Sequence, residues 1–161
     1  VTLAQQFVEP ACLDELFGEL DRILGHEPVL VLHIPGVAVD QGTISLAVDR
    51  TADLQRLHER VMDAIGPFEV PGLGRIRVAG ADAFRANGEA VRPQDVDWVS
   101  HYRERSAYAH YRPHVTLGHG DTSPSVQPID LRAEHIAVCE LGRFCTCRAV
   151  LRAWTLGGTS L

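Results

Sequence analysis

The sequence predicts an α+β fold in a single domain, and three observations lead to this class. Segments with a helical spacing of apolar residues alternate with short apolar segments that are typical of strands. The connections within 28–48 and 135–156 are short enough for antiparallel strand pairs, so a strictly parallel sheet is not expected. The chain has 161 residues, 45% of them hydrophobic, which suits one compact domain, 1–161, with a sizeable core.

The elements of the first half follow from their apolar patterns. Residues 11–25 place leucine and phenylalanine at helical spacing and stop at a glycine, which predicts a helix. Residues 28–33 are a short apolar run broken by Pro-Gly, and residues 43–48 are a second run, so both predict strands. Residues 54–65 form another amphipathic pattern, which predicts a helix that ends at the following Gly-Pro.

The second half is less regular. A strand is expected around 75–79, where Arg75 and Arg77 alternate and therefore point to one face. Residues 80–97 are polar and contain glycine without a clear period, which predicts an inserted loop. The remaining expectations are a short helical or irregular piece at 97–105, a strand at 114–118, a polar loop at 118–128, and closing strands near 135–141 and 147–156.

The net charge and the lack of long apolar runs argue against some classes of function. The formal net charge of −6 argues against a general nucleic-acid coat, which would have a basic surface, but it leaves room for a local basic cleft. Arg103, Arg105 and Arg112 cluster near the most informative motif. No apolar run approaches the roughly 18 residues that span a membrane, and no leader is visible, so a cytoplasmic location is expected.

The cysteines are interpreted as reduced structural thiols, because no extracellular signal accompanies them. Cys145-x-Cys147 lacks a second pair at the spacing of a zinc ribbon. The other two are Cys12 and Cys139.

The strongest local pattern is YRPHVTLG, residues 111–118. The proline can open a strand but cannot lie in its middle, so the strand proper begins at His114. Alternation then sends His114 and Thr116 to one face, and Val115 and Leu117 to the other, where they can enter the core.

An imidazole and a hydroxyl on one strand face suit a phosphate. The hydroxyl can donate to a non-bridging oxygen while the imidazole moves a proton to or from a bridging oxygen. Histidine is suited to this because its unperturbed pKa of about 6.5 leaves both forms populated near neutrality. A single His-x-Thr in a strand is common without any catalytic role, so the surrounding sequence has to decide.

The surrounding sequence resembles a known family. Residues 114–117, preceded by Tyr-Arg-Pro, resemble the second H-x-T/S-Φ signature of the 2H phosphoesterases, and more specifically of the bacterial 2′-5′ RNA ligase-like proteins. Residues 1–8, VTLAQQFV, resemble the first signature region without its histidine. Residues 34–68 are similar to the middle segment of the family and residues 141–154 to its closing hairpin, whereas 80–105 match least.

The resemblance implies a bilobed α+β fold with two pseudo-symmetric halves, each of which offers one H-x-T/S to a central cleft. One histidine would act as general base and the other as general acid in opening a 2′,3′-cyclic phosphate or a related diester, without a metal or other cofactor. Carried over by position, His114 is one acid/base, Thr116 and Thr2 are phosphate-holding hydroxyls, and Arg112 contacts the substrate. Tyr111 is a wall against a base or ribose, unless it is packed as such an aromatic residue more commonly is.

The expected partner is an RNA end or a cyclic nucleotide, with no DNA, no membrane and a monomeric chain. The family's first signature has a histidine immediately before Val1, where this sequence has none, so we expect the histidine and the first strand to lie upstream. A competing alignment takes residues 43–46, TISL, as a degenerate first signature with Thr43 in place of the histidine. The helix between Leu3 and the strands of 28–48 favours the N-terminal match.

Two other functions remain open. One is a nucleotide- or RNA-end-binding module that kept the fold and lost catalysis. The other is a metal-dependent hydrolase that uses His110, His114 and His119, although spacings of four and five residues put these side chains on inconsistent strand faces. The remaining histidines are expected on the surface or on helix faces, and they are His26, His33, His58, His101 and His135.

Overall fold

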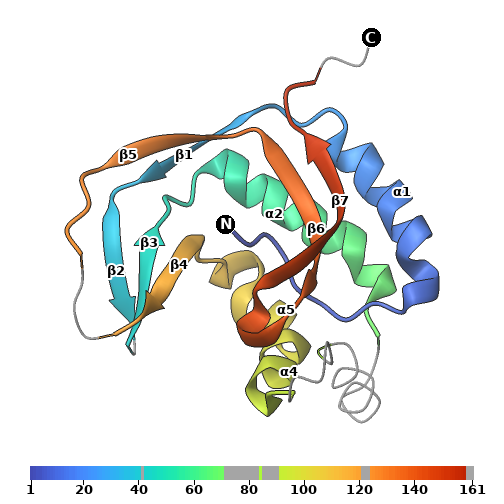
Figure 1. Cartoon of the computed structure of the whole chain (residues 1–161). Helices are drawn as coiled ribbons and strands as arrows, with labels where there is room; N and C mark the ends of the chain where they lie inside the picture. Colours follow the sequence, from blue (N-terminus) through green and yellow to red (C-terminus); the bar gives the residue numbers. More distant parts are fainter. Residues whose placement is uncertain (41, 71–83, 85–90, 121–123, 159–161) are drawn as a thin grey trace.

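The computed structural model describes residues 1–40, 42–70, 84, 91–120 and 124–158, and it confirms the α+β class (Figure 1). The helices are α1 (Leu13–Leu24), α2 (Ala52–Ile65), α4 (Pro93–Ser100) and α5 (Tyr102–Ser106), with short 3-10 turns η1 (Pro10–Cys12), η2 (Gly66–Phe68), η3 (Tyr108–His110) and η4 (Arg143–Cys145). The strands are β1 (Leu30–Ile34), β2 (Gly36–Asp40), β3 (Thr43–Ala47), β4 (His114–His119), β5 (Ile129–Ala133), β6 (His135–Leu141) and β7 (Cys147–Thr155).

The two long helices form the centre of the core, as their amphipathic patterns predict. Thr51 caps α2, because its Oγ1 accepts a hydrogen bond from the backbone N–H of Leu54 at 3.2 Å. The helices pack against each other and against the inner face of β1. The residues buried at this junction include Leu16, Leu20, Leu24, Leu30, Leu32, Ile34, Leu54, Leu57, Val61, Met62 and Ile65.

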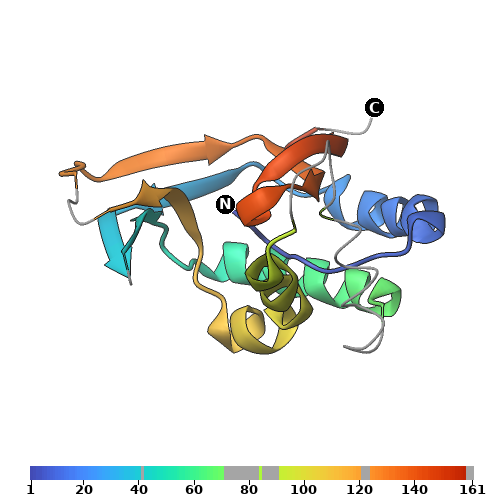
Figure 2. The same cartoon turned by 60° about the horizontal axis from the view of Figure 1, so that its bottom comes forward.

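The strands form three antiparallel sheets. β1 pairs with β5, β3 lies between β2 and β4, and β6 pairs with β7 as a hairpin. In the view of Figure 2, the β6–β7 hairpin lies above α2. The β6–β7 hairpin confirms the antiparallel pairing that the short connection within 135–156 predicts.

The antiparallel pairing expected within 28–48 is present, but it joins β3 to β2, a strand that the sequence prediction did not include. The strand predicted at 28–33 corresponds to β1, which pairs with β5. The chain turns at Pro35 and then continues in an extended conformation, so the Pro-Gly break separates two strands and does not end the extended region.

The expected loops also contain structure. α4 begins at Pro93, inside the predicted loop of 80–97, and proline is favourable at the first position of a helix. The predicted strand around 75–79, with Arg75 and Arg77, lies outside the described residues. Among the residues that the structure places, no helix combines the length and the apolar character needed to cross a membrane.

Candidate active site

The face of β4 that points away from the core presents the predicted polar pair. His114 and Thr116 are exposed, while Val115 between them packs against the main core. Leu117 was expected to enter the core, but its side chain is 49% exposed. The β3–β4 register shifts at this point, because Ser45 pairs with Thr116 and Ile44 with Gly118, so Leu117 has no partner and the alternation of faces is interrupted there.

β3 adds a second hydroxyl to this face. Ser45 lies directly opposite Thr116 in the β3–β4 register, and Ala47 lies opposite His114. Residues directly opposite each other in an antiparallel pair share a face, with Cβ atoms about 4.5–5.5 Å apart. The sequence placed Ser45 only within a competing first signature, and the strand pairing is what brings it beside the second signature.

The pairing also bears on the competing alignment. A first signature would have to face β4 across a cleft, but β3 is hydrogen-bonded to β4 within one sheet. Thr43, which that alignment puts in place of the histidine, lies at the far end of the sheet, with its Oγ1 3.3 Å from Nδ1 of His119. This pairing favours the N-terminal match over the competing alignment.

The imidazole of His114 has a defined tautomer. Its Nδ1 lies 2.9 Å from the carbonyl oxygen of Arg112. A carbonyl can only accept, so Nδ1 donates this hydrogen bond, and in the neutral form of the ring the lone pair is on Nε2. Nε2 has no hydrogen-bond partner among the described residues, and His114 is exposed, so this nitrogen is available to a ligand.

The N-terminal segment lies close to the start of β4. Residues 1–9 form neither helix nor strand, and in both views the N-terminus lies between β4 and the β6–β7 hairpin (Figures 1 and 2). The hydroxyl of Tyr111 donates to the Thr2 carbonyl at 3.2 Å, and the hydroxyl of Tyr102 donates to the Leu3 carbonyl at 3.4 Å. Leu3 packs against the core and the Thr2 side chain is exposed.

His58 is a residue of this region whose importance the sequence interpretation missed. It was expected on the surface or on a helix face, but it is 0% exposed. Its Nδ1 donates to the Leu3 carbonyl at 2.7 Å, and its Nε2 accepts the backbone N–H of Tyr108 at 2.8 Å. Tyr108 has a φ of 54°, in the left-handed region, and this hydrogen bond helps to hold it there. His58 thus links the N-terminal segment to the chain that leads into β4.

Burial lowers the pKa of His58, which favours the neutral imidazole that both hydrogen bonds require. A signal for its position exists in the sequence, because His58 follows Leu54 by four residues and lies on the apolar face of α2. The charged residues around it in the sequence obscure that signal.

Tyr111 supports the site from inside the core. Its side chain is 2% exposed, and its ring stacks on the imidazole of His58 with centroids 3.9 Å apart and an interplanar angle of 2°. Burial raises the pKa of its hydroxyl well above the ordinary value. The expectation that this ring forms a wall against a base or ribose is corrected, because the ring is enclosed and the packed alternative describes it.

Of the three arginines that cluster in the sequence near His114, two pair with carboxylates in the described structure and the third, Arg112, does not. Arg103 donates to Glu69 at 2.7 Å and to the hydroxyl of Tyr108 at 2.9 Å, and Arg105 pairs with Asp97 at 3.0 Å. Arg112 is exposed beside His114 and has no carboxylate partner within the described part of the chain. Arg112 is therefore the member of the cluster that is available to a phosphate.

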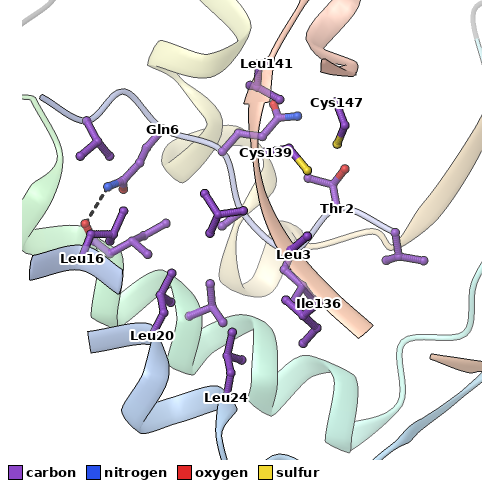
Figure 3. A pocket seen from close by; sticks show the side chains of 18 of the residues that line it. Thr2, Leu3, Gln6, Leu16, Leu20, Leu24, Ile136, Cys139, Leu141 and Cys147 are labelled. Carbon is purple, nitrogen blue, oxygen red and sulfur yellow. Dashed lines mark hydrogen bonds between the residues drawn. The ribbon is translucent and has the colours of Figure 1, made fainter. Parts of the chain in front are cut away.

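A mostly apolar cavity of about 290 Å³ adjoins Thr2. It lies between the N-terminal segment, the helices α1 and α2, and β6. Figure 3 shows the leucines of α1 at one end and Thr2 beside Cys139 and Cys147 at the other. His114, Thr116 and Arg112 do not line this cavity, so the structure ties Thr2 to the base of β4 without placing all the predicted site residues in one pocket.

The described residues contain no group of three or more histidine, cysteine, aspartate or glutamate side chains that could hold a metal ion. His110, His114 and His119, the trio considered for a metal site, form no such group. The four cysteines are free thiols.

A family model described as the 2′-5′ RNA ligase superfamily matches residues 1–141, a range that includes the N-terminal segment, β4 and all of β6. No curated protein matches the chain.

Proposed function

Because the chain belongs to the 2′-5′ RNA ligase superfamily, we propose that it is a metal-independent phosphodiesterase that acts on 2′,3′-cyclic phosphates or 2′-5′ linkages of RNA or nucleotides. One observation above all supports the proposal. His114 lies on the exposed face of β4, where its Nε2 has no partner within the described ranges, and the hydroxyl of Thr116 is on the same face.

The proposed roles follow from the chemistry of each group. Nε2 of His114 accepts or returns a proton at a bridging or attacking oxygen. The hydroxyls of Thr116 and Thr2 donate to non-bridging phosphate oxygens, and Ser45 adds a donor beside Thr116. Arg112 supplies positive charge to the same phosphate.

For a cyclic phosphate, the oxygen of water attacks phosphorus and the bond to one ribose oxygen breaks. The base removes a proton from water and an acid gives a proton to the ribose oxygen that leaves. His114 performs one of these transfers. The family resemblance assigns the other to a histidine directly before Val1, next to the segment that Tyr111 and His58 hold in place.

The first test is His114→Ala in a protein with histidine directly before Val1, assayed on 2′,3′-cyclic nucleotides. We expect the rate to fall about 10²–10⁴-fold, the usual contribution of a general acid or base. Retained turnover would refute the assigned role. The rate should be unchanged by a chelator, whereas loss of activity with a chelator would favour a metal-dependent hydrolase.

The second test compares histidine with alanine placed directly before Val1. The histidine form should be faster by about 10²–10⁴-fold if that position supplies the second transfer. Equal rates would exclude the position as a catalytic one. Binding of a cyclic nucleotide with no turnover in either form would favour the alternative of a binding module.

A further inference from the structure

The turn between β6 and β7 presents an exposed aromatic ring beside two guanidinium groups. Phe144, in η4, is 55% exposed. Cζ of Arg92 lies 3.8 Å from the centroid of its ring, and Cζ of Arg143 lies 5.2 Å from it. A positive charge near an aromatic ring is attracted to its π-electrons, so the three side chains form a cationic patch.

The backbone of this turn is held in a costly conformation. Phe144 has a φ of 62° and Cys145 a φ of 54°, both in the left-handed region that non-glycine residues rarely adopt. Asp95, 6% exposed, accepts the Phe144 N–H at 2.9 Å through Oδ2 and pairs with Arg92 at 3.0 Å through Oδ1. One buried carboxylate therefore fixes both the backbone of Phe144 and the guanidinium over its ring.

This arrangement does not serve the burial of Phe144. A phenylalanine side chain gains about 1.5–3 kcal/mol when it is fully buried, yet here the backbone is strained and the ring stays outside. An observed backbone outlier that the surrounding structure enforces is a reason to look for function.

The charge of the patch is also unusual for this chain. The basic residues are all arginines, and nine of the twelve that the structure describes pair with a carboxylate. Arg50 instead donates to backbone carbonyls. Arg143 and Arg112 have no carboxylate partner in the described ranges, so uncompensated positive charge is available at the turn and beside His114.

The turn adjoins the cavity that Thr2 lines. Cys145, the residue after Phe144, lines the same cavity as Thr2. The helix α4, which contains Asp95, is also tied to the N-terminal segment, because the indole Nε1 of Trp98 donates to Gln5 at 2.8 Å. A ligand whose phosphate lies near Thr2 could therefore extend toward the ring of Phe144.

We propose that Phe144 and Arg143 form a binding site for the nucleobase and phosphate of the nucleotide next to the reacting end. The substrate class is then the end of an RNA strand, in preference to an isolated cyclic mononucleotide. This inference rests on the proposed function. A base stacks on an aromatic face whatever its identity, and the guanidinium neutralises the adjoining phosphate.

The experiment measures affinities for two probes that are not turned over, a short oligoribonucleotide with a 3′-phosphate and a nucleoside 3′-monophosphate. Phe144→Asn removes the ring with a residue that tolerates a positive φ. It should weaken binding of the oligonucleotide about 5- to 150-fold and leave the mononucleotide unchanged. Phe144→Tyr, which keeps an aromatic face, should restore the affinity for the oligonucleotide.

Arg143→Gln provides a second measurement that does not alter the strained position. In the oligonucleotide titration, it should reduce the slope of log affinity against log salt by about 0.7. The matched control is Val150→Ala, an exposed side chain on β7 of the same hairpin, which should change neither quantity. Thermal unfolding of each variant checks that the fold is kept.

The outcomes separate the two proposals. If Phe144→Asn and Arg143→Gln bind the oligonucleotide as the unmodified protein does, the site at the turn is overturned while the proposed function stands. If the unmodified protein binds neither probe, both proposals are overturned. Equal weakening of both probes in Phe144→Asn would assign the ring to general support of the site and would also overturn the inference.

Discussion

The chain contains the tripeptide Val-Thr-Leu twice, and the structure treats the two copies differently. Residues 115–117 lie in β4, where Val115 and Thr116 pair with β3 and Leu117 falls at a shift in the register. Residues 1–3 have no strand partner in the described structure. Their carbonyls accept hydrogen bonds from side chains instead, those of Tyr111, Tyr102 and His58.

The two copies also use different apolar residues as anchors. In the first copy Leu3 packs against the core and Val1 is exposed, whereas in the second copy Val115 packs and Leu117 is exposed. The threonine is exposed in both. A tripeptide therefore does not determine whether the chain forms a strand, because strand preference depends on neighbours and burial. What the two copies share is an outward hydroxyl.

The largest expected effect comes from breaking the support of the first copy. His58→Ala leaves a cavity and removes the partners of the Leu3 carbonyl and the Tyr108 N–H. We expect the free energy of unfolding to fall by about 2–5 kcal/mol, measured by urea denaturation. His26→Ala, at an exposed position, is the control and should change little. A loss below about 1 kcal/mol for His58→Ala would contradict the proposed link.

A second comparison asks whether the two hydroxyls are equivalent. Thr2→Val and Thr116→Val each keep the shape of the side chain and remove one donor. If both hydroxyls hold the phosphate, each change should lower kcat/KM for a 2′,3′-cyclic nucleotide about 10- to 100-fold, in a protein with histidine before Val1. An effect in only one variant would show that the copies have different roles.

A smaller effect on stability is expected from the hydrogen bond that joins Tyr111, shortly before the second copy, to Thr2 in the first copy. Tyr111→Phe keeps the ring that stacks on His58 and removes the hydrogen bond to the Thr2 carbonyl. The expected loss of stability is about 0.5–1.5 kcal/mol. Amide hydrogen exchange should rise in residues 1–8 and stay unchanged in β4. An equal rise in exchange in residues 1–8 and in β4 would contradict the expectation that the Tyr111 hydroxyl supports only the N-terminal segment.

The smallest expected effect is on the pH dependence of stability. The pKa of His58 is lowered below 6.5 by burial, so the unfolded chain binds more protons than the folded one in that range. The contribution of His58 to the free energy of unfolding is present above pH 6.5, and it is lost as the pH falls toward the pKa of His58 in the folded protein. His58→Gln should remove that part of the decline in unfolding free energy, and an unchanged profile would contradict it.

His33 should behave in the opposite way. The hydrogen bond between His33 and Asp130, at 2.6 Å, raises the pKa of His33. The contribution of His33 to the free energy of unfolding is therefore present in full below pH 6.5 and is lost as the pH rises through its pKa in the folded protein. Asp130→Asn is therefore the control, because it should remove a contribution to stability that is lost as the pH rises, whereas His58→Gln removes one that is lost as the pH falls.

The sequence by itself determined the elements whose pattern is local. The spacing of apolar residues on α1 and α2 predicts both helices, and alternation after Pro113 predicts that His114 and Thr116 share a face. These features depend on residues a few positions apart, for which the periods of helix and strand are fixed by the backbone. The family resemblance likewise came from short motifs in a fixed order.

Only the tertiary structure decided which distant residues meet. The pairing of β1 with β5, the position of Ser45 beside Thr116, and the enclosure of His58 and Tyr111 each depend on segments that are far apart in the sequence. The physical reason is that strand pairing and burial are set by the packing of the whole core, and a local pattern is compatible with several partners.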